Sequence, residues 1–179
     1  MKKTAIAVLL CMAWASHFFA QTERGTWMLG ADLPGFGMSK YYWQGRLNFD
    51  AGYFVAKNWA VGSGIGLQYT ALKNGGEQYN YLTLQPSVFT RYYLPIPSKR
   101  LQFFTHAEAG LNWRRTETPD FQKDLSHFFK VGGGAEYFLS PRFSIEAGAF
   151  YDGTFQRLRG NWSLDFTLRY RFGGKKKKE

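Results

Sequence analysis

Polar and apolar residues alternate with a period of two along most of the chain after residue 25. A β-strand places successive side chains on opposite faces, so this alternation predicts strands rather than helices. The clearest example is the last segment, whose apolar face holds Trp162, Leu164, Phe166, Leu168, Tyr170 and Phe172. Seven earlier segments divide in the same way. The chain is therefore predicted to hold eight strands, each about 9–11 residues long, the length of a tilted membrane strand.

The connections between these segments alternate in length. Short ones lie at residues 56–58, 95–100 and 140–142, and longer polar ones at 34–44, 71–80, 115–127 and 152–160. Short periplasmic turns and long external loops are typical of outer-membrane barrels. We therefore expect an all-β fold, an eight-stranded antiparallel up-and-down transmembrane β-barrel over residues 21–172, with both of its ends in the periplasm.

The two ends of the chain have a different composition. Residues 1–20 combine Lys2 and Lys3 with an apolar run over residues 5–15, which predicts a signal peptide cleaved after Ala15 or Ala20. Cys11, the single cysteine, lies inside this segment. Residues 173–179, which include Lys175 to Lys178, are predicted to form a basic, solvated periplasmic tail.

Alternation alone does not show which face of the strands points outward, because a soluble lipocalin-like barrel would turn its apolar face inward. Aromatic residues at both ends of the apolar faces favour a membrane barrel with two aromatic girdles. The short-turn girdle would hold Tyr53, Trp59, Tyr92, Tyr137, Tyr170 and Phe172, and the long-loop girdle would hold Trp43, Tyr69, Trp113, Tyr151 and Trp162. Membrane lipids are therefore the expected surroundings of the barrel.

Charged residues on the opposite faces are expected to fill the lumen. Six acidic residues (Asp32, Asp50, Glu108, Glu136, Glu146 and Asp165) balance six basic ones (Arg46, Arg91, Arg114, Lys130, Arg169 and Arg171). Turns centred near residues 97, 121 and 141 would bring Arg91, His106, Glu136 and Glu146 to a similar depth. The predicted lumen ion-pair network comprises Arg91, His106, Glu108, Glu136, Glu146, Asp165 and Arg169. A salt-bridged plug is the first interpretation and a proton-sensitive gate is the second.

Three segments resemble the small OmpA/OmpX-like outer-membrane β-barrel family: "GTWMLGADL", the hairpin "GYFVAKNWAVGSGIGLQY" and the last strand "NWSLDFTLRYRF". The resemblance covers residues 25–172. It implies an eight-stranded barrel in the bacterial outer membrane whose last strand is recognised by the barrel-assembly machinery through a terminal aromatic residue, matched here by Phe172. The chain departs from the family in its extension at residues 173–179.

The sequence favours some functions over others. Basic residues are scattered among acids, which argues against nucleic acid as a partner. The chain has no HExxH, CxxC or P-loop pattern, and we predict no catalytic residue, cofactor or metal site. His127, beside Ser126 and Asp124 in a predicted loop, keeps a lipid-modifying enzyme as a third interpretation. A structural or loop-mediated role, with lipopolysaccharide or another surface partner, comes first, and a narrow channel second.

Overall fold

The computed structural model describes residues 22–39, 42–74, 77–98, 100–116, 123–155 and 160–173. The described residues form nine β-strands: β1 (Thr26–Asp32), β2 (Gly35–Ser39), β3 (Tyr42–Ala56), β4 (Trp59–Asn74), β5 (Glu77–Tyr93), β6 (Leu101–Thr116), β7 (Lys123–Phe138), β8 (Phe143–Thr154) and β9 (Gly160–Gly173). The predicted signal peptide at residues 1–20 and the lysines of the predicted tail lie outside the described residues.

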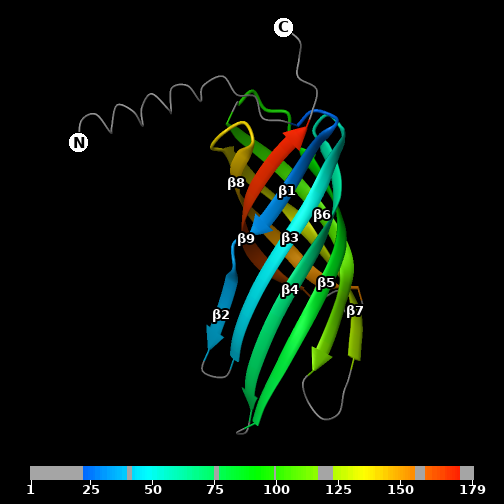
Figure 1. Ribbon diagram of the computed structural model, residues 1–179, viewed down its shortest axis with the longest axis vertical. Coiled ribbons are helices and arrows are strands. Elements are labelled where there is room, and N and C mark those ends of the chain that lie inside the picture. The colour runs from blue at the N-terminus through cyan, green and yellow to red at the C-terminus, as the bar shows by residue number, and fades with distance from the viewer. Residues whose placement is uncertain are drawn as a thin grey trace, which may run out of the picture.

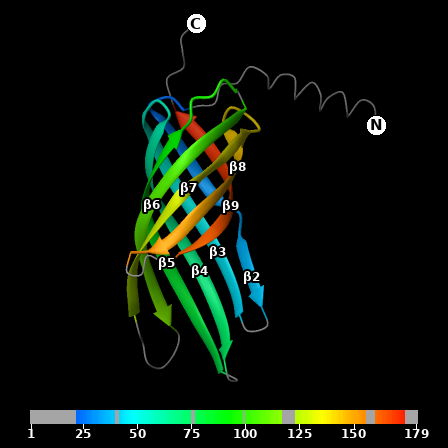
Figure 2. The same ribbon diagram turned by 180° about the vertical axis from the view of Figure 1, so that it is seen from behind.

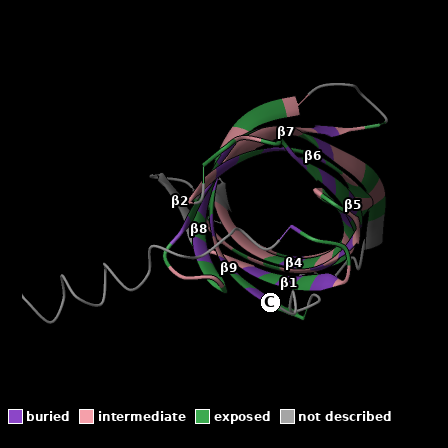
Figure 3. Ribbon diagram, turned by 90° about the horizontal axis from the view of Figure 1, so that it is seen from above, coloured by how far each residue is buried: buried purple, intermediate pink, exposed green. Residues whose placement is uncertain are grey.

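These strands close into one antiparallel barrel. From β2 to β9 each strand pairs with the next in the chain, and β1 pairs with both β9 and β3 to complete the ring (Figures 1 and 3). β1 and β2 are two segments of one barrel strand, because both pair with β3. The nine segments therefore make the eight-stranded antiparallel barrel predicted from the sequence.

The first barrel strand is interrupted at Leu33 and Pro34. Ala31 pairs with Phe49, whereas Gly35 pairs with Arg46, so the β1–β2 side uses one residue more than β3 over this step. An extra residue on one strand is the mark of a β-bulge, and proline, which lacks an N–H group, is tolerated in strands mainly at bulges and edges. The pairing between β1 and β9 ends at the same level. Its last pair is Asp32 of β1 with Thr167 of β9.

Apolar side chains cover the outside of the barrel and charged ones fill the inside. Leu164 and Trp162 on the outer face are both 75% exposed, whereas Arg169 and Arg171 on the same strand are 1% and 0% exposed. A water-soluble barrel would have the opposite distribution. No helix among the described residues is long and apolar enough to cross a membrane.

The strands are longer than predicted. β3 to β7 contain 15 to 17 residues each, and β4 and β5 extend well past the ends of β8 and β9 (Figures 1 and 2). Much of the four predicted long loops is therefore strand, and Ser126 and His127 lie in β7 rather than in a loop.

Short turns at the opposite end are held by local hydrogen bonds. Asn58 adopts a left-handed conformation with φ of 63° in the turn between β3 and β4, and its backbone N–H donates to the carbonyl of Thr22 at 2.8 Å. Asparagine is one of the few non-glycine residues that tolerate this conformation. Ser98 and Ser140 accept backbone N–H groups from Leu101 and Phe143, each at 3.0 Å. This end is called the short-turn end below.

Candidate functional site in the barrel lumen

A fully buried ion pair lies inside the lumen near the short-turn end. The guanidinium of Arg171 on β9 donates to Glu136 on β7 at 2.6 Å, and both side chains are 0% exposed. Glu136 also accepts a hydrogen bond from the Ser144 hydroxyl at 2.5 Å. Removing either charge from such a pair leaves the other buried and uncompensated, which is strongly destabilising.

Aromatic rings enclose this pair. The Arg171 guanidinium lies 4.8 Å from the centroids of the Tyr93 and Phe138 rings and 5.2 Å from that of Phe54. Cation–π attraction at these distances is strongest where water is excluded, as it is here. Met28, Phe54 and Tyr93 are 0% exposed, and Phe104 is 2% exposed. We call this layer of buried rings around the Arg171–Glu136 pair the sealed layer.

The rings of the sealed layer were missed by the sequence prediction, which expected only small and charged residues inside. Phe54, Tyr93 and Phe104 each follow an outward aromatic residue: Tyr53, Tyr92 and Phe103. In such a pair, composition does not distinguish the inward residue from the outward one. The signal that would have identified them is parity, because each stands an even number of residues from an inward charge on its own strand.

A second ionic cluster lies next to the sealed layer. Glu146 on β8 accepts from Arg91 on β5 and from Arg169 on β9, both at 2.5 Å. Arg169 also donates to the two oxygens of Asp50 on β3, at 2.6 and 3.1 Å. Two carboxylates thus share one guanidinium, and four strands on different sides of the barrel are tied together. Asp50 was counted among the inward charges but was not part of the predicted network.

The predicted register of this region was partly wrong. Arg91 pairs with His106 and Glu136 pairs with Glu146, but His106 pairs with Gly132, and Glu136 lies opposite Gln102. His106 is therefore displaced by four residues from Glu136. Its ring instead contacts Glu108 at 3.1 Å through Nε2 and Arg91 at 3.4 Å through Nδ1.

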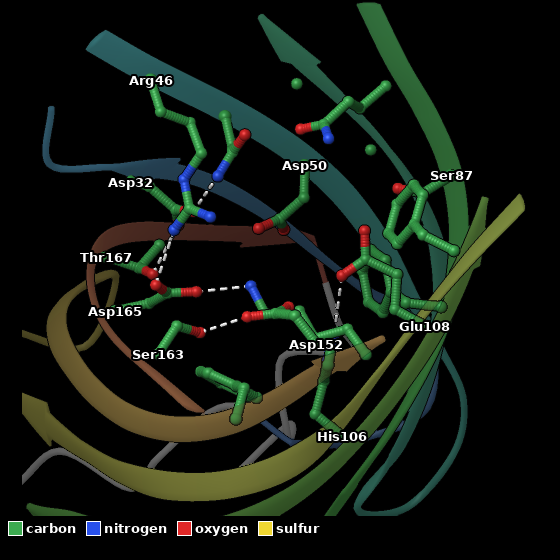
Figure 4. Close-up of a pocket in the computed structure, with 18 of the residues that line it drawn as sticks. Asp32, Arg46, Asp50, Ser87, His106, Glu108, Asp152, Ser163, Asp165 and Thr167 are labelled. Carbon is green, nitrogen blue, oxygen red and sulfur yellow. Dashed lines mark hydrogen bonds and ion pairs between the residues drawn. The ribbon is translucent and has the colours of Figure 1, made fainter. Parts of the chain in front are cut away.

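The end of the barrel opposite the short turns, where β4 and β5 extend furthest, is called the long-hairpin end (Figure 1). A third group of charges lies in the lumen toward this end (Figure 4). Asp165 on β9 pairs with Arg46 on β3 at 2.7 Å and with Lys130 on β7. Asp32 accepts from two neutral donors, the Asn48 amide and the Thr167 hydroxyl, each at 2.7 Å. Asp152 accepts from the Ser163 hydroxyl at 2.5 Å. These groups reach into the lumen from several strands around the barrel.

These charges line a cavity of about 600 Å³ between the sealed layer and the long-hairpin end. Its lining includes six carboxylates (Asp32, Asp50, Glu108, Glu146, Asp152 and Asp165) and four basic side chains (Arg46, Arg91, Lys130 and Arg169). The sequence predicted six acidic and six basic residues in the lumen, and this count was inexact for two reasons. Asp152 is a lumen residue rather than a loop residue, whereas Arg114 is exposed, with its guanidinium 5.7 Å from the centroid of the Tyr81 ring.

Comparison with known proteins agrees with this architecture. The model of the outer membrane protein beta-barrel domain family matches residues 5–173. The chain belongs to this family. Family membership and the apolar outer wall together locate the protein in the bacterial outer membrane. A search of curated protein sequences finds no match.

Several solved outer-membrane barrels share the fold of this family member. The crystal structure of Neisserial surface protein A is 16% identical, with a TM-score of 0.56, and the match covers 83% of this chain and 97% of that one. Ail of Yersinia pestis, in complex with the heparin analogue sucrose octasulfate, is 14% identical, with a TM-score of 0.57 and coverage of 83% and 99%. The N-terminal barrel domain of Pseudomonas aeruginosa OprF is 14% identical, with a TM-score of 0.51 and coverage of 83% and 98%.

The lumen of this outer-membrane barrel contains a serine, a glutamate and a histidine, but not in a hydrolytic arrangement. Glu108 lies between His106 and Ser87, so the imidazole does not contact the hydroxyl that it would have to activate. Ser126 and His127 face opposite sides of β7, and the side chain of Asp124 lies outside the described residues. Among the described residues, no three His, Cys, Asp or Glu side chains are grouped so as to hold a metal ion.

The outer face of the barrel carries the aromatic residues that were predicted as girdles. Trp43, Trp59, Trp113, Tyr137, Trp162, Tyr170 and Phe172 are exposed, and Tyr53 and Tyr151 are half-buried. Several are in ring contact, including Tyr151 with Trp162 at 5.7 Å, Trp43 with Tyr69 at 5.6 Å and Tyr170 with Phe172 at 6.1 Å. Trp27, which was predicted on the apolar face but not as a girdle residue, lies 5.0 Å from Tyr53 and 6.5 Å from Phe172.

Proposed function

We propose that this outer-membrane barrel is a closed, non-conducting structural protein that presents its long hairpins at the cell surface. Its short-turn end faces the periplasm, and its sealed layer prevents water and ions from passing. The observation that carries this proposal is the Arg171–Glu136 pair, which is fully buried and surrounded by three aromatic rings. An ion crossing this layer would have to separate a buried ion pair, which is energetically unfavourable.

The outward aromatic residues support a membrane position for the barrel. Trp43 and Tyr53 on β3, and Trp59 and Tyr69 on β4, are ten residues apart in each case. Ten residues that rise about 3.3 Å each, on strands tilted by about 40°, span roughly 25 Å along the membrane normal. This matches the apolar band of outer-membrane barrels. We assign the two sets of rings to the two membrane interfaces.

The long-hairpin end is the surface from which an external partner would be bound. Arg114 and Arg115 on β6 are exposed at this end. Guanidinium groups are well suited to phosphate, so we propose lipopolysaccharide phosphates as their first partner. At the other end, the outward Phe172 would be the signal read by the barrel-assembly machinery, and residues 174–179 would be a tail without a structural role.

A narrow channel is the second candidate, and one observation favours it. The cavity of about 600 Å³ already occupies the lumen on the long-hairpin side and is lined by Arg91, Glu146 and Arg169. Rearrangement of the sealed layer alone would therefore connect the two ends. Loss of the negative charge of Glu136 or Glu146, as in a glutamine variant, would release the arginines that these carboxylates hold in place.

Single-channel recording in planar bilayers distinguishes the two functions. Purified, refolded wild-type protein is expected to give no conductance steps at neutral or acidic pH. A variant with the sealed layer removed, Phe54→Ala combined with Tyr93→Ala and Arg171→Ala, is expected to conduct and shows that the assay detects an open lumen. Reproducible steps from the wild type at neutral pH would establish the channel, and steps only at acidic pH that Glu136→Gln makes permanent would establish the gate.

A further inference from the structure

The lipid-facing wall of the barrel is hollowed over β7 and β8. One row of register partners across the wall is Phe103, Ala135, Ala147 and Phe166, and the next is Thr105, Gly133, Ala149 and Leu164. In each row two small residues lie between larger ones. The hollow has a volume of about 580 Å³, within the range of about 300–1,000 Å³ that is usual for small-molecule sites.

Larger outward residues follow the floor along β7 and β8. On the short-turn side, the next pair of outward residues on β7 and β8 is Tyr137 and Ile145, and on the other side it is Val131 and Tyr151. The floor is bordered on its β6 side by Phe103 and on its β9 side by Leu164 and Phe166. This shape differs from a simple stripe of small residues, because a molecule lying in it would be contacted on its flanks as well as beneath.

The depth of the hollow comes from the backbone. Gly134 and Gly148, the inward residues next to the floor, carry no side chain, so the ring of the inward Phe104 reaches the lining. A Cβ atom at Gly134 would overlap the carbonyl oxygen of Ala147 on the neighbouring strand. Because this close approach needs glycine, the depression is part of the fold and not the result of one side-chain rotamer.

The occupant must be hydrocarbon. The hollow opens on the lipid-facing wall between Tyr137 and Trp162, which we assign to the two membrane interfaces, so lipid tails rather than water would meet it. A second copy of the barrel fits poorly, since a twofold axis would place hollow against hollow and leave both unfilled. An acyl chain is flexible enough to follow the floor between Phe103 and Phe166, whose strands are about 14 Å apart.

Positive charge at the short-turn rim identifies the kind of lipid. Leu94, just after β5, lines the hollow, which therefore extends toward this rim. Arg100 and Arg142 immediately precede β6 and β8 there, and Arg142 is exposed. From Arg142 to Ala147 is five residues, about 13 Å along the membrane normal at the usual strand rise and tilt. A headgroup phosphate at the rim would thus place its acyl chain at the floor.

We propose that the hollow is a binding site for one phospholipid of the periplasmic leaflet, with one acyl chain on the floor between β6 and β9 and an anionic headgroup beside Arg142. The site lies outside the lumen and does not depend on whether the lumen conducts. A ligand of this site needs two groups: a phosphate that binds the Arg142 guanidinium and a hydrocarbon chain that lies in the apolar hollow.

Native mass spectrometry of folded protein released from nanodiscs of phosphatidylethanolamine and phosphatidylglycerol tests this site. The wild type is expected to retain one phospholipid, predominantly phosphatidylglycerol. The variant Ala135→Leu/Ala147→Leu fills the floor and is expected to retain at least tenfold less. The matched control is Ala109→Leu, which adds the same side chain to the lipid-facing wall of β6 outside the hollow, and it should behave as wild type. Heat-modifiable migration on gels verifies that each variant is folded.

The headgroup is tested by Arg142→Gln, which should still retain a lipid but lose the preference for phosphatidylglycerol. Equal retention by the filled variant and the wild type would overturn the site. A wild-type dimer that the filled variant loses would also overturn it, in favour of contact between copies. An unchanged headgroup preference in Arg142→Gln would overturn the role of the rim.

Discussion

Arg171 and Glu136 form an ion pair at 2.6 Å in which neither side chain has any solvent exposure. Neutralising one partner leaves the other charge buried among aromatic rings, so Arg171→Met is expected to lower the free energy of unfolding by about 3–5 kcal/mol. Urea unfolding in lipid vesicles, followed by tryptophan fluorescence, measures this loss. The control is Lys57→Ala, which removes an exposed pair with Glu23 at 3.9 Å and should cost less than about 1 kcal/mol. Equal free energies of unfolding for the two variants would show that the buried pair contributes no more to stability than the exposed one.

Glu146 binds two arginines at once, and this sharing predicts non-additive effects. Arg91→Met and Glu146→Gln each remove the same 2.5 Å contact, so the double variant should be more stable than the sum of the single changes implies, by about 0.5–3 kcal/mol. The measurement is a double-mutant cycle of unfolding free energies in vesicles. Arg91→Met combined with Lys57→Ala serves as the reference cycle and should be additive. Coupling of equal size in both cycles would contradict the assignment.

Gly134 is predicted to tolerate no side chain. A methyl group there would overlap the carbonyl oxygen of Ala147, which belongs to the backbone and has little freedom to move. Gly134→Ala should therefore destabilise the barrel by about 1–3 kcal/mol. At Gly45 the nearest atoms belong only to the Trp43 ring, at 3.3 Å, so Gly45→Ala should change stability by less than about 0.5 kcal/mol. Unfolding midpoints in urea compare the two, and a larger loss at Gly45 would refute this explanation.

The positions of the tryptophans predict how bromine-labelled lipids quench their fluorescence. Trp27, Trp43, Trp59, Trp113 and Trp162, the tryptophans among the described residues, are between 39% and 75% exposed on the outer face. If they lie at the two membrane interfaces, bromines near the headgroups should quench more strongly than bromines at the ends of the acyl chains. Stronger quenching from the chain ends would place the rings at the membrane centre and overturn the assignment of the girdles.

The lysine tail is predicted to be dispensable for folding. The last residue of β9, Gly173, still pairs with Thr26 of β1, so a chain that ends at Gly173 keeps every described strand pair. The expected result is an unchanged yield of heat-modifiable barrel in the outer membrane. A chain that ends at Leu168 loses most of the pairing with β1 and provides the control that must fail. Loss of assembly in the first truncation would assign the lysines a role in biogenesis.

Alternation along the strands, taken together with the connection lengths and the aromatic residues at the strand ends, predicted the barrel, its antiparallel order and the outward face of residues such as Trp162 and Phe166. It was less informative where two aromatic residues are adjacent, as at Tyr92 and Tyr93, because either one satisfies the pattern. The error in register between β6 and β7 has a simple cause. Residue 119 lies midway between His106 and Gly132, whereas the prediction placed the turn at residue 121. An offset of two residues in the turn shifts every pair by four.

The network inside the lumen depends on contacts that no single strand reveals. Arg46 reaches Asp165, which is 119 positions away in the chain, and Arg169 reaches Asp50 over the same separation. The sequence shows that such charges point inward, but the choice of partner depends on strand tilt and side-chain length. For the same reason the hollow in the outer wall was not foreseen, because it requires the small residues of β7 and β8 to lie side by side.

The interruption of the first barrel strand at Leu33 and Pro34 also determines how the ring comes apart. The seam between β1 and β9 contains only seven residue pairs, whereas the neighbouring β8–β9 ladder has eleven and β4–β5 has sixteen. It also joins the two ends of the barrel sequence, so its closure carries the largest loss of chain entropy. We therefore expect this seam to form last during folding and to separate first under mechanical load.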